Sequence, residues 1–360
     1  MEPVWTRARE LCEQVGDTAQ LSEVLIGLFG FHGVRGELQA ALEMAEQILG
    51  LGQREHDVFL LWVAHFGIGF ILFFRGELVP ARSNFERALA LYDPQQHRDR
   101  ALLNAQDHMV SCLCHLAWSL VILGYPDQAV RRIREALTRA RELVHPYSQV
   151  YALLHAFTIY QHRRDVSAVQ KYVEAMMAIC EAQEFAFWLA VGRFYEGWVL
   201  VAQGHGEEGI AQMRPGIAPS ERLMAPYFRA LLAEAYATIG QIAEGWAVLA
   251  EALEEVDQGE GRFYAAELHR LKGELLLRQT MTNASQAEAC FQQALDLARR
   301  SQAKWWELRA AMSLSRLWQN QGKRDTARQL LAEVYGWFTE GFDTADLQEA
   351  RALLNELQGG

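Results

Sequence analysis

A frame of small and apolar residues recurs about every forty residues along this chain and restricts its fold more than any other feature. The tetrapeptide RGEL occurs at residues 35–38 and again at 75–78. Counted from Gly76, a small residue lies seven positions earlier, and alanine or aromatic residues lie five, nine and twelve positions later. The frame returns around turns near residues 36, 76, 124, 164, 204, 240, 282 and 322. This spacing indicates eight repeated units.

Each unit is predicted to be a helix, a tight turn and a second helix. The small residue before the turn lets the two helices approach, the glycine accepts a left-handed conformation, and the alanine after it packs where the helices cross. Arg164-Asp165 replaces the glycine in the fourth unit, and residues 280–285 form a looser turn in the seventh. One hairpin cannot bury its apolar face alone, so neighbouring units must stack. The sequence therefore predicts an all-α superhelix of about eight hairpins.

The two ends of the chain are predicted to differ. Residues 1–16 match the second helix of a unit whose first helix is missing, so the chain is expected to begin in mid-repeat, as a fragment of a larger protein. Residues 17–340 hold the eight hairpins. Residues 341–360 are predicted to form a capping helix and tail, with Gly341 ending the helix before it.

This frame resembles the tetratricopeptide repeat, most clearly in residues 66–94. The resemblance implies a right-handed α-α superhelix. Units of about forty residues are similar to the arrays of bacterial signalling ATPases and of maltose-regulon transcription activators. Residues 124–140, 263–277 and 337–357 resemble the repeat region that ends multidomain bacterial proteins with a class III adenylate or guanylate cyclase-like domain or a kinase, then an ATPase module. The pattern departs at residues 213–226, where a proline interrupts the second helix.

The resemblance implies a non-catalytic scaffold that senses an effector or binds a protein or peptide segment. Its attached ATPase, cyclase or kinase domain would lie outside this chain. The sequence has no Walker-type, HExxH or GxSxG signature and no GxGxxG that follows a predicted strand, so we expect neither an enzyme nor a cofactor site. Five cysteines, mostly at apolar helical positions, favour reduced thiols in the cytoplasm.

Charge and hydrophobicity disfavour two kinds of partner. The net charge is −11 and no basic stripe is present, which disfavours nucleic acid. The most apolar run, residues 59–74, would span only roughly 24 Å as a helix, short of the ~30 Å hydrocarbon core of a membrane. We therefore expect a helix buried on most sides.

One alternative is a metal-dependent or other enzyme that uses histidines of the first helices. His108, Cys112 and His115 are spaced i, i+4 and i+7, which is compatible with a metal site. No fourth ligand is apparent and the helix is apolar, so we favour packed core residues and predict no metal.

The inner surface of the array gives the clearest functional pattern. In repeats of this type the first helix of each hairpin lines the concave side, and these positions change from aromatic to charged along the chain. Two interpretations remain open: a groove for a partner, or aromatic side chains packed between turns of the superhelix. A third, a structural spacer or oligomerisation array, would apply if the groove is filled by its own side chains. The predicted groove residues are Phe66, Phe70, Phe73, Trp118, Tyr151, Phe194, Trp198, Tyr227, Glu234, Glu267, Arg270, Arg309 and Arg316.

Overall fold

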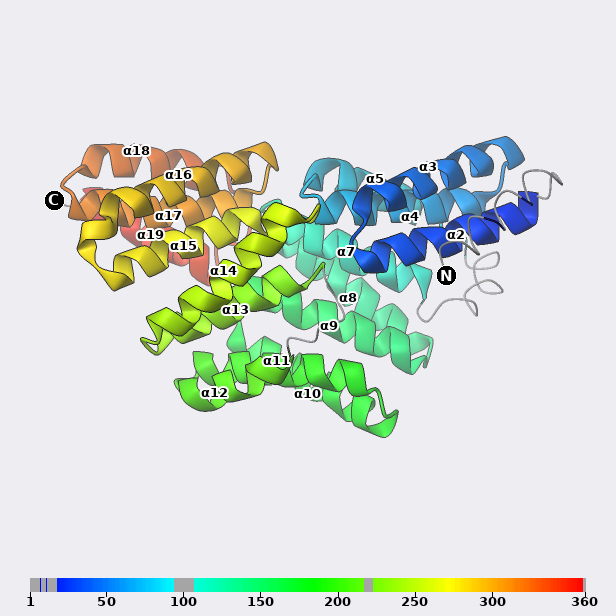
Figure 1. Cartoon of the computed structure of the whole chain (residues 1–360), viewed down its shortest axis with the longest axis horizontal. Coiled ribbons are helices and arrows are strands. Elements are labelled where there is room, and N and C mark those ends of the chain that lie inside the picture. The colour runs from blue at the N-terminus through cyan, green and yellow to red at the C-terminus, as the bar shows by residue number, and fades with distance from the viewer. Residues whose placement is uncertain (1–6, 8–10, 12–17, 94–106, 217–222, 359–360) are drawn as a thin grey trace.

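The structure, a computed structural model, describes residues 18–93, 107–216 and 223–358 together with Arg7 and Leu11 (Figure 1). All regular secondary structure in these ranges is helical. Eight helix hairpins follow one another: α2 (Thr18–Arg35) with α3 (Leu38–Glu55), α4 (Val58–Phe74) with α5 (Leu78–Ala90), α7 (His108–Ile122) with α8 (Pro126–Glu142), α9 (Pro146–His162) with α10 (Val166–Ala182), α11 (Ala186–Ala202) with α12 (Gly206–Met213), α13 (Ala225–Thr238) with α14 (Ile242–Gln258), α15 (Ala265–Gln279) with α16 (Ala284–Arg300), and α17 (Lys304–Asn320) with α18 (Arg324–Tyr335). Helix α19 (Ala345–Gln358) follows the last hairpin, and short 3-10 turns lie at Arg214–Gly216 and Met281–Asn283.

The turn inside each hairpin falls where the sequence spacing predicts it. Gly76, for example, has a φ of 81°, which only glycine adopts readily. Arg164 takes the equivalent place in the fourth unit with a φ of 58°. Asp165 follows it and caps α10, because its side chain accepts a hydrogen bond from the Ala168 N–H at 3.0 Å. The predicted all-α superhelix of about eight hairpins is therefore confirmed.

The fifth hairpin shows why small residues are needed where the two helices cross. A Cβ atom on Gly197 of α11 would clash with the carbonyl oxygen of Gly209 in α12, and a Cβ on Gly209 would clash with that of Gly197. The second helix of this unit is short, ending at Met213 before the 3-10 turn that contains Pro215, as the sequence predicts.

Gly197→Ala is expected to destabilise the protein by about 1–3 kcal/mol, because the added methyl group must push two backbones apart. Gly50→Ala is the matched control. A Cβ there meets nothing within 4 Å, so alanine should raise stability by up to about 1 kcal/mol through helix propensity. Urea unfolding of the two variants measures both effects, and equal stabilities would contradict the close packing of α11 against α12.

The apolar run 59–74 forms most of α4, which packs between α3 and α5 and against α7. Its residues Phe73 and Phe74 are buried, as are Trp62 and Ile71. Among the described residues, no helix combines the length and apolar character that a membrane span would need.

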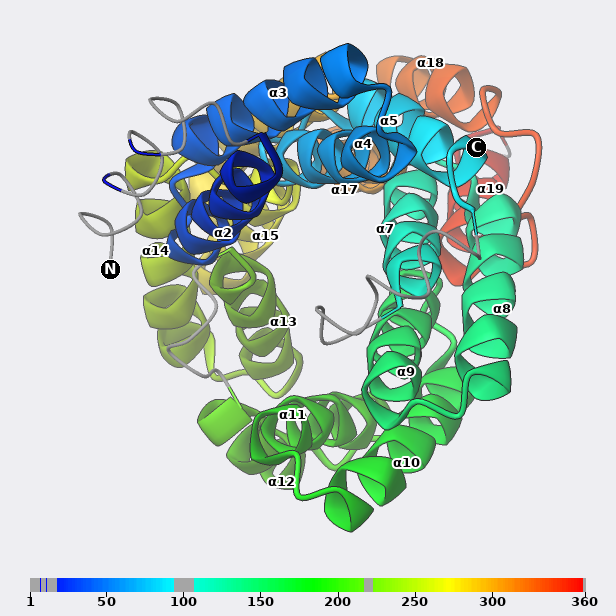
Figure 2. The same ribbon diagram turned by 90° about the vertical axis from the view of Figure 1, so that its right-hand side faces the viewer.

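The superhelix winds until its later units meet its earlier ones, and seen end-on in Figure 2 the helices surround a central space. At one contact, which we call the first seam, the N–H groups of Arg262 and Phe263 donate to the Phe74 carbonyl oxygen at 2.7 and 3.1 Å. The Phe263 ring lies 5.2 Å from Phe73 and 5.5 Å from Trp118. Aromatic side chains from distant units therefore pack together between superhelical turns.

A second seam joins α8 and the α9–α10 turn to α19 and to the connector between α18 and α19. The N–H groups of Asp127 and Gln128 donate to Glu340 Oε1 at 2.9 and 3.0 Å, so a residue over two hundred positions away caps α8. In return, the Gly341 N–H donates to Asp127 Oδ2 at 3.0 Å.

The expectation that Gly341 ends the last hairpin is wrong. Helix α18 ends at Tyr335, and Gly341 lies within the connector, against Pro126 of α8, with a φ of 77°. Gly336 is the C-cap of α18, and the connector then runs to the second seam. The predicted truncated repeat at residues 1–16 falls almost wholly outside the described residues, and the division of the chain into these segments stays a prediction.

Candidate binding site inside the superhelix

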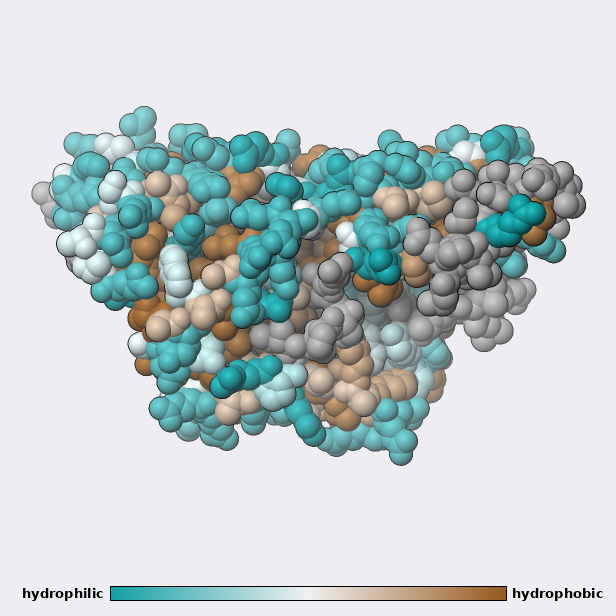
Figure 3. All heavy atoms as spheres, viewed as in Figure 1, coloured by the Kyte–Doolittle hydropathy of each residue, from teal (hydrophilic) through white to brown (hydrophobic). Residues whose placement is uncertain are grey.

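Two cavities on the inner side of the superhelix share three of their lining helices. The first, of about 590 Å³, is lined by α2, α4, α7, α9, α11 and α13 and is mainly apolar. We call it the apolar cavity. The second, of about 420 Å³, is lined by α9, α11, α13, α15, α17 and α19 and is rich in charged side chains. We call it the ionic cavity. Figure 3 shows hydrophobic residues gathered in recesses between helices whose outer surface is largely hydrophilic.

Aromatic side chains make up most of the apolar cavity. Helix α2 contributes little to its wall beyond Phe29 and Val34, because Gly30 and Gly33 face it. A Cβ atom on either glycine would meet nothing within 4 Å, so there is open space beside the backbone of α2. The remaining aromatic and histidine lining consists of Phe66, Phe70, Phe74, His115, Trp118, Tyr147, Tyr151, His155, Phe187, Trp188 and Phe228.

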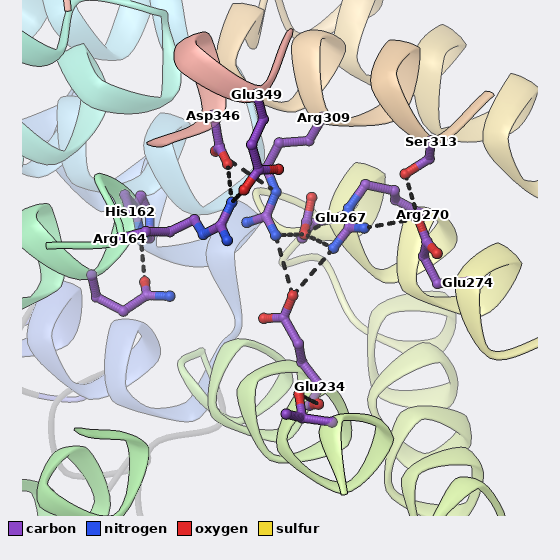
Figure 4. A network of polar contacts seen from close by, with 12 residues as sticks. His162, Arg164, Glu234, Glu267, Arg270, Glu274, Arg309, Ser313, Asp346 and Glu349 are labelled. Atoms are coloured by element: carbon purple, nitrogen blue, oxygen red, sulfur yellow. Dashed lines mark hydrogen bonds and ion pairs between the residues drawn. The ribbon is translucent and has the colours of Figure 1, made fainter. Parts of the chain in front are cut away.

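The ionic cavity is built on a network of alternating charges (Figure 4). At the centre of the network, Glu267 is 1% exposed, and its Oε1 accepts hydrogen bonds from Arg270 Nε and Nη2 at 2.9 and 2.6 Å. Arg309 Nη2 lies 3.3 Å from the same oxygen and 3.2 Å from Glu234 Oε1. Further contacts join Arg270 to Glu274, Arg309 to Asp346, Arg164 to Asp346 and Glu349, and Arg316 to Glu349.

The charges in this network hold one another ionised. Burial alone would raise the pKa of the Glu267 carboxyl, but the nearby Arg270 and Arg309 guanidinium groups outweigh it, so the pKa lies below the ordinary 4.5. For Arg309, burial opposes the charged form, and Glu267, Asp346 and Glu234 outweigh that effect to raise its pKa. The network therefore gathers four arginines and five acids of this part of the chain around the ionic cavity.

A chain of buried hydrogen bonds separates the two cavities. Thr158 Oγ1, in the apolar cavity, lies 3.3 Å from the Tyr195 hydroxyl, which donates to the Tyr227 hydroxyl at 3.0 Å. Tyr227 donates in turn to Gln161 Oε1, in the ionic cavity, at 2.9 Å. His162 Nδ1 lies 2.7 Å from that oxygen. This buried polar layer lies between the two cavities, and α9, α11 and α13 line both of them.

The three residues with metal-compatible spacing pack in the core. His108 lies 4.6 Å from the Trp62 ring, the Cys112 thiol donates to the Phe85 carbonyl oxygen at 3.3 Å, and His115 Nδ1 contacts the Ser111 carbonyl oxygen at 3.0 Å. Across the part of the chain that is described, no group of three or more His, Cys, Asp or Glu side chains is arranged to hold a metal ion.

The structure divides the predicted groove residues into three groups. Phe66, Phe70, Trp118 and Tyr151 line the apolar cavity. The ionic cavity is lined by Trp198, Glu234, Arg270, Arg309 and Arg316. Phe73, Phe194, Tyr227 and Glu267 are buried and line neither cavity. Cavity lining and aromatic packing between superhelical turns therefore coexist among these residues, and Trp118 takes part in both.

Trp118 belongs to the apolar cavity and to the core at once. It is 3% exposed, contacts the Phe73 and Tyr227 rings, and donates from Nε1 to His162 Nε2 at 3.2 Å. Removing a buried side chain of this size costs about 3–5 kcal/mol. Trp118→Ala would therefore disturb the fold as well as the cavity, and it is unsuitable as a test of binding alone.

The sequence pattern did not find the contributions of α2 and α19. Gly30 and Gly33 break the frame expected for a packed helix, which was a usable signal. Asp346 and Glu349 reach the ionic cavity because the superhelix closes, which no periodicity reveals. Arg164 stands where most units have the turn glycine, and this departure could have indicated that its side chain makes a specific contact, here with Asp346 and Glu349.

Comparison with known proteins places the fold. No family model and no curated protein matches the chain. Among solved structures, a Rap protein complexed with Competence and Sporulation Factor has a TM-score of 0.59 at 11% identity, covering 94% of this chain and 88% of that one. The Rap conjugation gene regulator of plasmid pLS20, in complex with the Phr* peptide, gives a TM-score of 0.55 at 12% identity, with coverages of 93% and 95%. The apo quorum sensor NprR from B. thuringiensis gives 0.52 at 12% identity, with coverages of 92% and 96%.

At these identities the likenesses establish the fold alone. Together with the glycine and alanine positions of the hairpins, they make the chain a tetratricopeptide-like superhelix.

Proposed function

We propose that this superhelix is a non-catalytic module that binds a short peptide or protein segment along its inner surface. The observation that carries this proposal is the pairing of an aromatic cavity with an ionic one along the same three helices. Two proteins of similar fold were solved in complex with Competence and Sporulation Factor and with the Phr* peptide, which supports this kind of ligand for such a superhelix.

The site sets a direction for its occupant. Apolar or aromatic side chains bind near Phe66, Phe70 and Tyr151, where burial of apolar area supplies the main gain in free energy. Polar or charged groups reach Trp198 and Arg316 at the other end. A segment that is apolar at one end and polar at the other matches both cavities, and the reversed segment would bury charge among aromatic rings.

The wider setting follows from the sequence resemblance. We place the module in a cytoplasmic bacterial signalling protein, where it passes the bound state to an attached ATPase, cyclase or kinase domain. Stacked repeats couple neighbour to neighbour, so an occupant that contacts several units changes the shape of the whole array.

Gly30→Leu is expected to weaken peptide binding without loss of stability. The new side chain enters open space in the apolar cavity and occupies part of it, while leucine improves helix propensity. Peptides selected from a random heptapeptide library on the wild-type protein, labelled and measured by fluorescence anisotropy, serve as the probe. We expect them to be rich in aromatic residues and to lose roughly tenfold or more in affinity for the variant.

Gly50→Leu is the control, since it makes the same change on α3, also in open space but outside both cavities. Equal affinities for the two variants would place the peptide elsewhere. A library that yields no binding peptide would contradict the proposed function itself.

A further inference from the structure

The ionic cavity is complete only while the superhelix is closed. Gln161 and Arg164 come from the fourth unit, and Asp346 and Glu349 come from α19. These residues are about 180 positions apart and meet across the second seam, where Arg164 Nη1 lies 3.2 Å from Asp346 Oδ1 and 2.6 Å from Glu349 Oε1. Figure 4 shows Arg164 reaching toward the two carboxylates of α19. One wall of the binding site is therefore made by closure of the superhelix.

Arg163 strengthens the same contact from outside the cavity. Its Nη1 donates to Asp127 Oδ1 at 3.0 Å and its Nη2 donates to Asp343 Oδ2 at 2.9 Å. The guanidinium group thus joins α8 and the α18–α19 connector beside the backbone bonds already made through Glu340 and Gly341.

The two seams differ in how firmly they hold. The first seam packs buried aromatic side chains, with Phe73, Phe263 and Trp118 all less than a tenth exposed. The second seam relies more on ion pairs, two of them to exposed acids, Asp127 at 42% and Asp343 at 72%. It also holds the buried Asp346, 2% exposed, and the Tyr125–Trp337 ring contact at 5.4 Å. Exposed ion pairs are screened by water and salt and contribute little each. The second seam is thus the one that a ligand can bias.

We propose that the second seam is a latch coupled to the groove: an occupant of the ionic cavity holds it closed, and loss of the occupant favours separation of α19 and its connector from α8 and the α9–α10 turn. This inference rests on the proposed function and adds its regulation. Because a ligand that contacts both sides of the seam binds the closed form better, closure and binding must strengthen each other by the same factor. The part that moves is the C-terminal end of the array, so the position of α19 and its connector depends on whether the ionic cavity is occupied.

Asp127→Ala tests the latch without touching either cavity. It removes the acceptor of Arg163 Nη1 and of the Gly341 N–H, and Asp127 lines neither the apolar nor the ionic cavity. Asp325→Ala is the matched control, because Asp325 holds the same first-turn place in α18 but is 100% exposed and contacts only Arg328 of its own helix among the ion pairs described.

Two measurements read the outcome. Hydrogen exchange followed by mass spectrometry reports segments 124–128 and 337–344, which hold the Asp127, Gln128 and Gly341 amides whose hydrogen bonds cross the seam. Fluorescence anisotropy reports affinity for the library-selected heptapeptides. We expect the wild-type seam to exchange more slowly when the peptide is bound. We expect Asp127→Ala to exchange faster and to bind roughly fivefold or more weakly, with Asp325→Ala like wild type in both.

The failures are distinguishable. Faster seam exchange in Asp127→Ala with unchanged affinity would overturn the coupling while the groove remains a binding site. Unchanged seam exchange in that variant, or in the wild type on adding peptide, would also overturn the latch. If the wild-type protein selects no peptide, the proposed function fails and the coupling fails with it.

Discussion

The free energy of unfolding is expected to fall steeply as the pH is lowered from 7 toward 4, because three histidines are buried in their neutral form. Burial lowers the pKa of His115 to about 4, and of His155 and His162 to about 3, from an ordinary 6.5. His115 and His155 each place Nδ1 3.0 Å from a carbonyl oxygen of their own helix. None of the three can gain a proton without placing a charge inside the superhelix.

The direction of this change in unfolding free energy follows from proton binding. Between pH 6.5 and about 4 the unfolded chain holds protons on these three side chains and the folded chain does not, so acid favours unfolding. Each such proton lowers the free energy of unfolding by about 1.4 kcal/mol for each pH unit, and three together lower it by about 4 kcal/mol for each unit. The charged and titratable groups that face these histidines do not reverse this effect of acid. His155 lies 5.1 Å from His115, which disfavours its protonation further, and at His162 the opposing effects of Arg309 and Glu267 are smaller than that of burial.

Urea unfolding at pH 7, 6 and 5 measures this dependence. His155→Leu should reduce the slope of unfolding free energy against pH by about a third, whatever it does to the stability at pH 7. His56→Gln is the control, since His56 is exposed at the end of the first hairpin, and its slope should match wild type. A wild-type slope near zero, or one that His155→Leu leaves unchanged, would contradict the buried neutral histidines.

Local features of the fold could be predicted from sequence because they are set within each hairpin. The glycine of a turn and the small residue seven positions earlier are fixed by contacts between two adjacent helices. Gly76 and the close pair Gly197 and Gly209 show this directly. Even the departure at Arg164 retains a left-handed turn.

Closure of the superhelix could not be predicted in this way. Whether later units meet earlier ones depends on small rotations between units that add up over the array, and no residue type records the sum. From the sequence alone, Trp118 therefore fitted an open groove and a packed seam equally well. In the structure it lines the apolar cavity and also packs at the first seam. Glu267 occupies a groove position by register but is covered by the arginines that neutralise it.

Replacing Glu267 with alanine is expected to destabilise the protein by about 3–5 kcal/mol, because it removes the central acid of the ionic network and leaves buried positive charge. Arg270 is 7% exposed, and Arg309 lies 3.3 Å from the same carboxylate oxygen. Glu251→Ala is the control: Glu251 is 63% exposed and pairs with Arg229 at 3.2 Å, so its loss should cost under about 1 kcal/mol. Urea unfolding at pH 7 compares the two.

A double replacement separates charge from shape in this network. If the cost of losing Glu267 is uncompensated charge, then Arg270→Met in the Glu267→Leu background should recover stability relative to Glu267→Leu alone, since apolar side chains of similar size replace the pair. Arg309 keeps Glu234 at 3.2 Å and Asp346 at 3.9 Å in that variant, so the remaining charges stay paired. No recovery would mean that the hydrogen-bonded geometry around Arg270, including its 3.5 Å contact with Glu274, matters more than charge balance. Since Arg270 lines the ionic cavity, the double variant should also lose selected peptides whose polar end binds there, even where its stability is restored.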